Sequence, residues 1–354
     1  MSARGLASQL QAGAEIGVRR VLRPLGGDGM AWRQPIVATM ALLSLCGGAA
    51  AQAPSRVFKI GFLIASPWDS RFFEPAITRA FADRGYILGT NLAFDIKAAS
   101  GKLELLPALA DELVADHVDL IMTRGYPSAV AAKERAAAVP VVVSGSGDPV
   151  ATHLVMSLAR PGANLTGVSE IAADLSAKRL QILKEAIPSL RTVAVLWNAD
   201  DLAMTLRYNS SRDEATKLGV AIQPLGVHAP NDFAVAFAAM VRDPPDAIMM
   251  LTDALTILNR KRVVDFAAEH RIPAIFEGDS LVREGGLMSY GPDGAALLNR
   301  AVGLADRVLK GASPADLPLE LPTKFVFAIN LKAAKALGLD LPESIVLRAD
   351  QVVE

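Results

Sequence analysis

The chain has 354 residues, a length that suits two domains better than one small domain. Hydrophobic residues make up 51% of the chain and aromatic residues 5%, so we expect cores built from aliphatic side chains. The net charge of −1 gives no basic excess that would favour a nucleic-acid partner. Cys46 is the single cysteine, which excludes a disulfide within the chain and a metal cluster held by cysteines.

Residues 1–53 end in the pattern of a secretory signal peptide. Arg33 precedes an apolar run over 36–45 that is too short to span a bilayer. Ala51 and Ala53, small residues on either side of Gln52, then provide a cleavage point after Ala53. An N-terminal anchor helix is the alternative. We expect cleavage and, for a mildly acidic mature chain without cysteine, a periplasmic location.

The start of the signal is open between two methionines. Met30 alone would begin a compact signal, whereas a start at Met1 would add an extension without periodicity, which we expect to be disordered. Lipidation at Cys46 is not expected, because Leu45 stands where a lipoprotein signal needs a small residue.

From residue 57 onward, aliphatic runs alternate with amphipathic helical patterns. The expected strands are 57–65, 92–98, 118–123, 139–144 and 165–169, and the expected helices are 71–84, 103–116, 127–138 and 149–159. Such alternation is typical of βαβ units, whose right-handed crossovers build a parallel sheet.

Residues 139–169 have the form of a ligand-binding unit. A buried valine strand leads into the small-residue loop 144–148, and Pro149 suits the first turn of a helix. Loops at the carboxyl ends of strands are where open α/β sheets bind small molecules. The segment contains no obvious catalytic group, which favours a binding protein over an enzyme.

The alternation restarts after residue 169 and predicts a second sheet. Helices are expected at 174–187, 202–218, 232–242 and 254–270, and strands at 192–197, 220–227, 247–251 and 272–276. Asn231 is the expected N-cap of the third of these helices.

The chain then returns through a strand at 287–292, a helix at 293–310, a strand at 325–330 and a helix at 331–337. No flexible linker separates the halves, so we expect two lobes joined by short hinge strands. The expected first lobe is 54–166 with 291–320, and the second is 167–290 with 321–354. The placement of the last thirty residues stays open.

Several motifs resemble those of one family. They are Gly61-Phe62-Leu63, residues 106–113, 147–150, 158–169, 178–180 and 285–291, and Pro322-Thr323-Lys324-Phe325 with 329–332. Over residues 60–354 the chain resembles the ABC-transporter substrate-binding proteins of the tryptophan/tyrosine-type family. Ala159-Arg160-Pro161-Gly162 with Asn164, Thr166 and Gly167-Val168-Ser169 is the most specific match.

The resemblance implies an α/β fold of the periplasmic-binding-protein type 1, with two Rossmann-like lobes whose parallel sheets are joined by hinge strands. It also implies an exported, non-enzymatic receptor that closes on a small solute, an amino acid or related carboxylate, and delivers it to an ABC permease in the inner membrane. We expect a monomer without cofactor, metal or nucleic-acid partner. Where relatives often have a pair of small residues after the third strand, this chain has Arg124-Gly125-Tyr126-Pro127. The identity of the solute therefore cannot be inferred from the family.

The loops at the strands' carboxyl ends should face the cleft between the lobes and hold the solute. Its expected contacts are Ser66, Trp68, Asp69, Arg124, Gly125, Tyr126, Ser128, Ser146, Gly147 and Asp148 from the first lobe, Asn198, Thr252, Asp253, Glu277 and Asp279 from the second, and Tyr290 on the hinge side.

These residue types predict distinct contacts. Exposed N–H groups at helix starts favour a carboxylate, and Arg124 is suited to pair with an acid. Asp148, Asp253 or Asp279 can accept from an ammonium group, while aromatic side chains such as Tyr126 can stack on an apolar part. The alternative is that the aspartates and serines only cap helices.

Two other functions stay open on the same fold: a ligand-sensing module of a signalling system, and a racemase or hydrolase. An enzyme would need an acid, base or thiol pair across the cleft. Cys46 lies inside the signal, which disfavours a thiol racemase, and the four histidines lie far apart in sequence.

Overall fold

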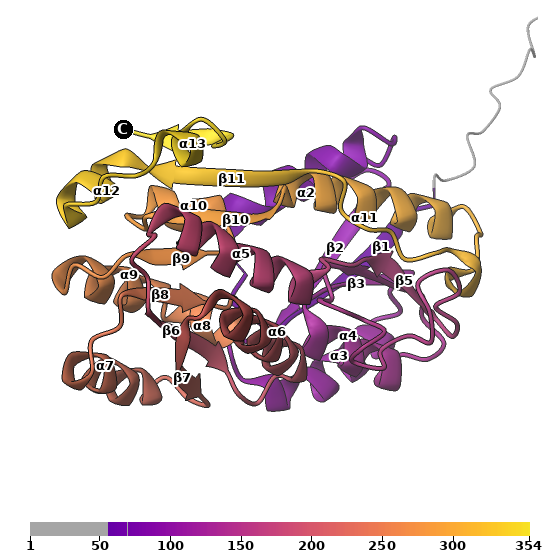
Figure 1. Ribbon diagram of the computed structural model, residues 1–354. Helices are drawn as coiled ribbons and strands as arrows, with labels where there is room; N and C mark the ends of the chain where they lie inside the picture. Colours follow the sequence, from indigo (N-terminus) through magenta and orange to yellow (C-terminus); the bar gives the residue numbers. More distant parts are fainter. Residues whose placement is uncertain (1–55, 69) are drawn as a thin grey trace, which may run out of the picture. The chain divides into compact units, whose positions relative to one another are not determined.

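The computed structural model describes residues 56–68 and 70–354, whose strands form two separate sheets (Figure 1). Helices alternate with strands through most of this part of the chain, so the predicted α/β class is confirmed. The expectations for residues 1–53, including the signal peptide, lie outside the described residues.

The first sheet is fully parallel. Its strands are β1 (Phe58–Ile64), β2 (Leu92–Ala98), β3 (Leu120–Arg124), β4 (Val141–Ser144) and β5 (Leu165–Val168), in the order β2-β1-β3-β4-β5. Aliphatic runs such as the three valines that begin β4 are fully buried, because helices cover both faces of a parallel sheet.

Alternate side chains of this sheet pack into two cores. Leu120 and Val142 face one core, and Ile121 and Val141 face the other. The first core is closed by α2 (Ser70–Ala82) and α11 (Gly294–Leu309), and the second by η1 (Leu103–Leu105), α3 (Leu106–Ala115) and α4 (Tyr126–Arg135). We call this sheet with its helices the first lobe.

The second sheet has seven strands and one antiparallel pair. The strands are β6 (Thr192–Asn198), β7 (Ala221–Val227), β8 (Ala247–Met250), β9 (Ala274–Phe276), β10 (Met288–Pro292), β11 (Phe325–Asn330) and β12 (Gln351–Val353), in the order β12-β11-β10-β9-β8-β6-β7. Strand β11 enters the sheet antiparallel to β10, and all other neighbours are parallel.

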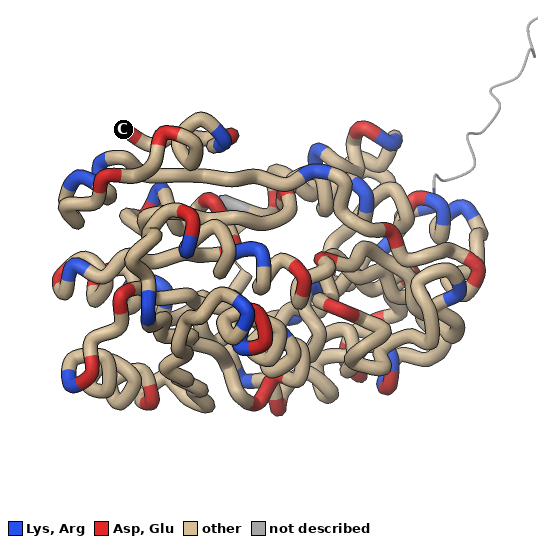
Figure 2. Tube along the Cα trace, in the orientation of Figure 1, with Lys and Arg blue, Asp and Glu red and all other residues tan. Residues whose placement is uncertain are grey.

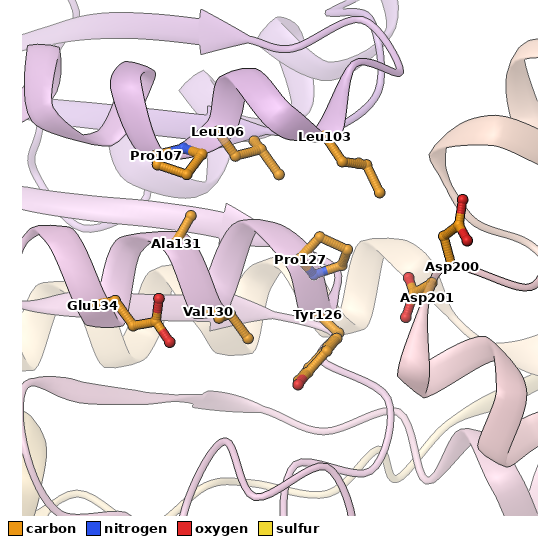
Figure 3. Close-up of a pocket in the computed structure, with 10 residues that line it drawn as sticks. All are labelled: Leu103, Leu106, Pro107, Tyr126, Pro127, Val130, Ala131, Glu134, Asp200 and Asp201. Carbon is orange, nitrogen blue, oxygen red and sulfur yellow. The ribbon is translucent and has the colours of Figure 1, made fainter. Parts of the chain in front are cut away.

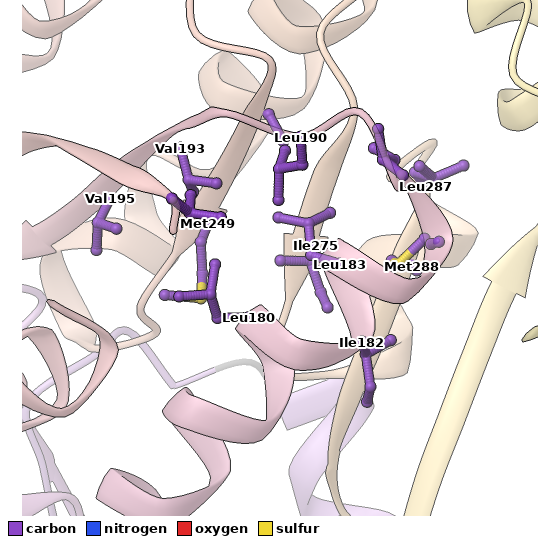
Figure 4. Packing of buried hydrophobic residues seen from close by; sticks show 14 of the residues in the cluster. Leu180, Ile182, Leu183, Leu190, Val193, Val195, Met249, Ile275, Leu287 and Met288 are labelled. Carbon is purple, nitrogen blue, oxygen red and sulfur yellow. The ribbon is translucent and has the colours of Figure 1, made fainter. Parts of the chain in front are cut away.

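Helices cover both faces of the second sheet, and we call the whole the second lobe. They are α5 (Ala172–Ala186), α6 (Leu202–Leu218), α7 (Asp232–Arg242), α8 (Ala254–Leu258), α9 (Arg260–Glu269), α10 (Asp279–Arg283), α12 (Leu331–Leu337) and α13 (Glu343–Val346). Leu180 and Leu183 of α5 lie against strand residues such as Val193 and Met249 (Figure 4). Helices α5 and α6 lie side by side.

Three segments connect the lobes: the residues after β5, those between β10 and α11, and those between η2 (Pro314–Asp316) and β11. Backbone hydrogen bonds tie them together. The Ser169 N–H donates to the Glu320 carbonyl at 2.8 Å, and the Asp293 N–H donates to the Lys324 carbonyl at 3.0 Å. The exact lobe bounds stay a prediction, although β11 and β12 belong to the second sheet.

The helix predicted at 149–159 is wrong. Residues 149–160 form turns and bends. One turn begins at Asp148, whose carboxylate accepts from the Ala151 N–H at 3.2 Å, but His153 has a φ of +58°. That left-handed conformation stops a helix. The sequence between Pro149 and Arg160 carries no glycine to announce the stop.

Two finer expectations also need correction. The single helix expected at 254–270 is divided at Asn259 into α8 and α9. Asn231 lies at the N-cap of α7, but its side chain makes no capping hydrogen bond. Instead the Asp232 carboxylate accepts from the backbone N–H groups of His228 and Ala229, at 2.8 and 3.0 Å.

Candidate functional site

The loops at the carboxyl ends of the strands carry nearly all the expected solute contacts. In the first lobe, Ser66 and Trp68 follow β1, Arg124 to Ser128 end β3 and begin α4, and Ser146, Gly147 and Asp148 follow β4. In the second lobe, Asn198 ends β6, Thr252 and Asp253 follow β8, Glu277 and Asp279 follow β9, and Tyr290 lies in β10. Asp69 lies outside the described residues.

Two of the first-lobe loops are hydrogen-bonded to each other. The Gly125 N–H donates to the Gly145 carbonyl at 2.8 Å, which joins the start of α4 to the loop after β4. Gly145 has a φ of +82°, and a Cβ there would lie 2.4 Å from the Glu170 carboxylate. The positive φ favours glycine at this position, and a larger residue would also have to displace the Glu170 carboxylate.

Several buried polar atoms have no hydrogen-bond partner in the described part of the chain. They belong to Trp68, Thr123, Ser128, Ser146, Trp197, Arg207, Gln223, Thr252 and Ser289. Four are hydroxyls at the strands' carboxyl ends: Thr123, Ser128 and Ser146 of the first lobe, and Thr252 of the second. An unpaired buried hydroxyl costs about 1–3 kcal/mol, so each of the four is a candidate contact for a solute.

A cavity of about 230 Å³ opens beside Tyr126, between α3, α4 and the start of α6 (Figure 3). Its wall is mostly apolar, with carboxylates at the rim. The lining residues are Leu103, Leu106, Pro107, Tyr126, Pro127, Val130, Ala131, Glu134, Asp200 and Asp201. Tyr126 packs against cores of both lobes. Burial, followed by the charges of Asp201 and Glu134, raises the pKa of Tyr126.

Asp201 is the buried acid of this region. It caps α6 by accepting from the Ala203 and Met204 N–H groups, at 2.8 and 3.4 Å. Burial and then the nearby charge of Asp253 raise the pKa of Asp201 to about 6, against the opposing charge of Arg207. A cationic group placed beside this carboxyl would be favourably held.

The expected acids of the second lobe already have partners. Asp253 forms a capping box with Thr256, and its second oxygen accepts from the Asn198 amide at 2.6 Å. Asp279 pairs with Arg283 at 2.7 Å. In the first lobe, Asp148 caps a turn. The capping alternative thus describes a real role of Asp148 and Asp253, which leaves their contact with a solute a prediction.

Glu277 lies in a buried ion network. One of its oxygens pairs with Arg179 at 3.0 Å, and the other pairs with Arg207 at 2.9 Å. Arg207 also pairs with Glu170 at 3.1 Å. Both oxygens of Glu277 are therefore engaged before any solute arrives.

The aromatic candidates lie in different surroundings. Trp68 packs against Phe62 and Phe73, with ring centroids 5.5 and 5.8 Å apart. Arg124 is exposed, and its guanidinium lies 5.8 Å from the centre of the Phe73 ring. The Tyr290 ring stacks on Phe325, whereas Ser66 is partly buried after β1.

Thr123, Glu170, Asp201 and Arg207 were not among the expected contacts. Thr123 is the penultimate residue of β3 and Asp201 follows β6, so the strand-end rule could have found both. Arg207 lies inside α6, and its partners are 37 and 70 residues away in the sequence. No local pattern signals such a long-range pairing.

Within residues 56–68 and 70–354, no helix has both the length and the apolar character needed to cross a bilayer. The same residues contain no group of three or more His, Cys, Asp or Glu side chains placed to hold a metal ion. Charges of both signs are interspersed along this part of the chain (Figure 2).

The family model described as "ABC transporter substrate binding protein" matches residues 74–353. A tyrosine-binding protein of Clostridioides difficile is 29% identical over 262 residues, which are 74% of this chain and 75% of the relative. The fold also matches solved structures. An ABC domain from Streptococcus pneumoniae in complex with L-Trp has a TM-score of 0.77 and 26% identity, covering 84% of this chain and 100% of the relative.

A third relative lacks a ligand. The ligand-free, open structure of a substrate-binding protein with adhesive properties from Clostridium difficile has a TM-score of 0.61 at 25% identity, covering 84% of this chain and 99% of that one. At nearly equal identity, the described residues thus superpose better on the L-Trp complex than on this open structure.

Proposed function

Because the chain belongs to the ABC transporter substrate-binding protein family, we propose that it is the exported receptor of an ABC importer. In this proposal the two lobes close on a small solute and deliver it to a permease in the inner membrane, without changing it chemically. Members of this family bind solutes and are not enzymes, which agrees with the proposal. Closure is then a shift between open and closed states that the solute favours.

We propose an aromatic amino acid or a related small carboxylate as the solute. The relatives' descriptions name L-Trp and tyrosine as what those proteins bind. In this chain, the hydroxyls of Ser128 and Ser146 are fully buried without partners near the start of α4, where free N–H groups favour a carboxylate. The Asp201 carboxyl suits an ammonium group, and the apolar wall beside Tyr126 suits a ring.

The observation that carries the proposal is the set of unpaired buried hydroxyls near the carboxyl ends of strands in both lobes, Thr123, Ser128 and Ser146 in one and Thr252 in the other. Such groups are costly to a protein that never fills them. A bound carboxylate would pair them.

The test is isothermal titration of the mature chain with L-tryptophan, L-tyrosine, L-phenylalanine, 3,4-dihydroxybenzoate and L-leucine. We expect at least one aromatic compound to bind with a Kd in the micromolar range or tighter. Ser146→Ala should then weaken binding about tenfold. Ser211→Ala is the matched control, because Ser211 is equally buried but donates to the Arg207 carbonyl within its own helix.

Absence of heat and of any thermal shift with all five compounds at millimolar concentration would reject the proposed solute class. Export is tested separately. A mass spectrum of the protein recovered from the periplasm should show a chain that begins after Ala53, and a chain that keeps residues 36–45 would contradict the predicted cleavage.

A further inference from the structure

We propose that the ion pair between Arg207 and Glu170 is a latch between the lobes, and that Arg207 is a positioning residue for solute retention. The inference rests on the proposed function. It assigns a role in binding to two side chains that need not touch the solute.

Arg207 belongs to the second lobe through α6. Its Nη1 donates to Glu277 at 2.9 Å, and Glu277 in turn pairs with Arg179 of α5 at 3.0 Å. These three side chains lie on elements of the second lobe. Arg207 therefore has a fixed anchor in its own lobe, independent of the first.

Glu170 lies in the segment that connects β5 to α5, and backbone and side-chain hydrogen bonds tie this segment to the first lobe. It follows β5, and its backbone N–H donates to the Gly147 carbonyl at 3.3 Å. The hydroxyl of the preceding Ser169 donates to the same carbonyl at 2.8 Å. The Arg207 contact with the Glu170 carboxylate, at 3.1 Å, thus joins a second-lobe helix to the loop after β4.

This loop carries one of the unpaired hydroxyls. Ser146 lies between Gly145 and Gly147, which have φ values of +82° and +72°. The Glu170 carboxylate fills the space where a Cβ of Gly145 would lie, and the Arg207 guanidinium lies 3.4 Å from where a Cβ of Gly147 would lie. The ion pair therefore packs directly against the backbone that presents Ser146.

The two contacts of Arg207 make a reversible latch. A buried charge left without a partner is costly, so an ion pair that was the only contact of Arg207 would oppose opening of the lobes. When the lobes open and the ion pair with Glu170 breaks, Arg207 is still paired with Glu277. Opening therefore does not leave its buried charge without a partner. Burial opposes the charged form of Arg207, but the charges of Glu277 and Glu170 raise its pKa, which keeps it cationic in the arrangement described.

The test compares Glu170→Gln with wild type. Nitroxide labels at Met156→Cys and Val235→Cys report the distance between the lobes, because both side chains are exposed, one in each lobe. Mature protein without residues 1–53 contains no other cysteine. Pulsed electron resonance is recorded without solute and with saturating L-tryptophan or L-tyrosine.

We expect Glu170→Gln to move the distribution toward longer distances in both conditions. The Kd for L-tryptophan and L-tyrosine should rise about tenfold, by the same factor for each, mainly through faster dissociation. Glu170→Asp keeps the charge but shortens the side chain, and should give a smaller shift. Glu185→Gln is the control, because its exposed pair with Arg348 lies within the second lobe and should leave distances and Kd unchanged.

Unchanged distance distributions in Glu170→Gln would overturn the latch. So would a loss of affinity for only one of the two amino acids, because that pattern indicates direct contact with the solute. If neither amino acid binds the wild type, the proposed solute class fails, while the distances measured without solute still decide the latch.

Discussion

The loops at the strands' carboxyl ends form one edge of each lobe, and the two edges differ in how their polar groups are paired. We call the edge of the first lobe the neutral edge and that of the second lobe the charged edge. Three of the unpaired hydroxyls, those of Thr123, Ser128 and Ser146, lie in the first lobe, and Thr252 supplies one in the second lobe. The second lobe presents charged groups that are already engaged, such as Glu277 with its two arginines. In the proposed function, the neutral edge binds the solute's carboxylate and the charged edge holds the lobes in place.

The largest expected effect comes from the charged edge. Glu277→Gln removes the carboxylate that Arg179 and Arg207 share, and leaves Arg179 buried without an ion-pair partner among the described residues. We expect the free energy of unfolding to fall by about 3 kcal/mol, measured by urea denaturation. The exposed pair of Glu185 is the reference, since Glu185→Gln should cost under about 1 kcal/mol. Equal losses in the two variants would contradict the assigned role of the buried network.

The next effect concerns Asp201 and depends on pH. Its pKa of about 6 in the folded protein exceeds the ordinary value of 3.8, so the folded state binds more protons between these values. The contribution of Asp201 to the free energy of unfolding is therefore highest below about pH 4, falls as the pH rises, and is constant above about pH 6. Asp201→Asn keeps a good N-cap and removes the charge. We expect the free energy of unfolding of the variant at pH 7 to exceed that of wild type by about 2 kcal/mol. This value follows from a shift of about two pKa units and is reduced because the asparagine accepts the two backbone hydrogen bonds less strongly than the carboxylate does.

That advantage should fade as pH falls from 7 to 4, as followed by urea denaturation of the solute-free protein at several pH values. A difference between Asp201→Asn and wild type that is constant from pH 4 to 7 would show that Asp201 has an ordinary pKa. If Asp201 also holds the solute's ammonium group, the same variant should bind L-tyrosine more weakly in spite of its greater stability.

A smaller effect on stability, of opposite sign to that at Glu277, is expected at the neutral edge. Ser146→Ala removes an unpaired buried hydroxyl, so the solute-free protein should gain about 0.5–1 kcal/mol in its free energy of unfolding. The same change should weaken solute binding. Thermal unfolding with and without L-tryptophan measures both. A loss of stability in the solute-free protein would indicate that the Ser146 hydroxyl has a structural role, and would remove the contrast between the two edges.

The sequence was sufficient for features that depend on local patterns. Buried aliphatic runs and amphipathic helices follow short periods, so the alternation of strands and helices and the position of the strand-end loops were predictable. The loop after β4 was predicted as a ligand loop because its glycines and serines stand at a strand end, and that role stays a prediction.

Long-range pairings were not predictable. The partners of Arg207 come from other elements far along the chain, and Glu277 gave the same strand-end signal as a solute contact although both its oxygens are engaged. The helix expected after Pro149 failed because His153 takes a left-handed conformation that its residue type does not announce. Pairing of β11 antiparallel to β10 likewise depends on how the chain returns to the second sheet.

The smallest expected effect is that of Tyr126→Phe, which tests whether Tyr126 contributes to solute binding through its ring or through its hydroxyl. The ring packs against cores of both lobes, and Asp201 lies in the same cavity wall. Tyr126→Phe keeps the ring, so we expect the Kd for an aromatic solute to change less than about threefold, which is under 1 kcal/mol. Tyr126→Ala removes the ring and should cost more than tenfold. Titration calorimetry of both variants separates the two cases. Equal losses of affinity would assign the contribution of Tyr126 to its hydroxyl. The neutral edge would then include a fourth polar group from the first lobe.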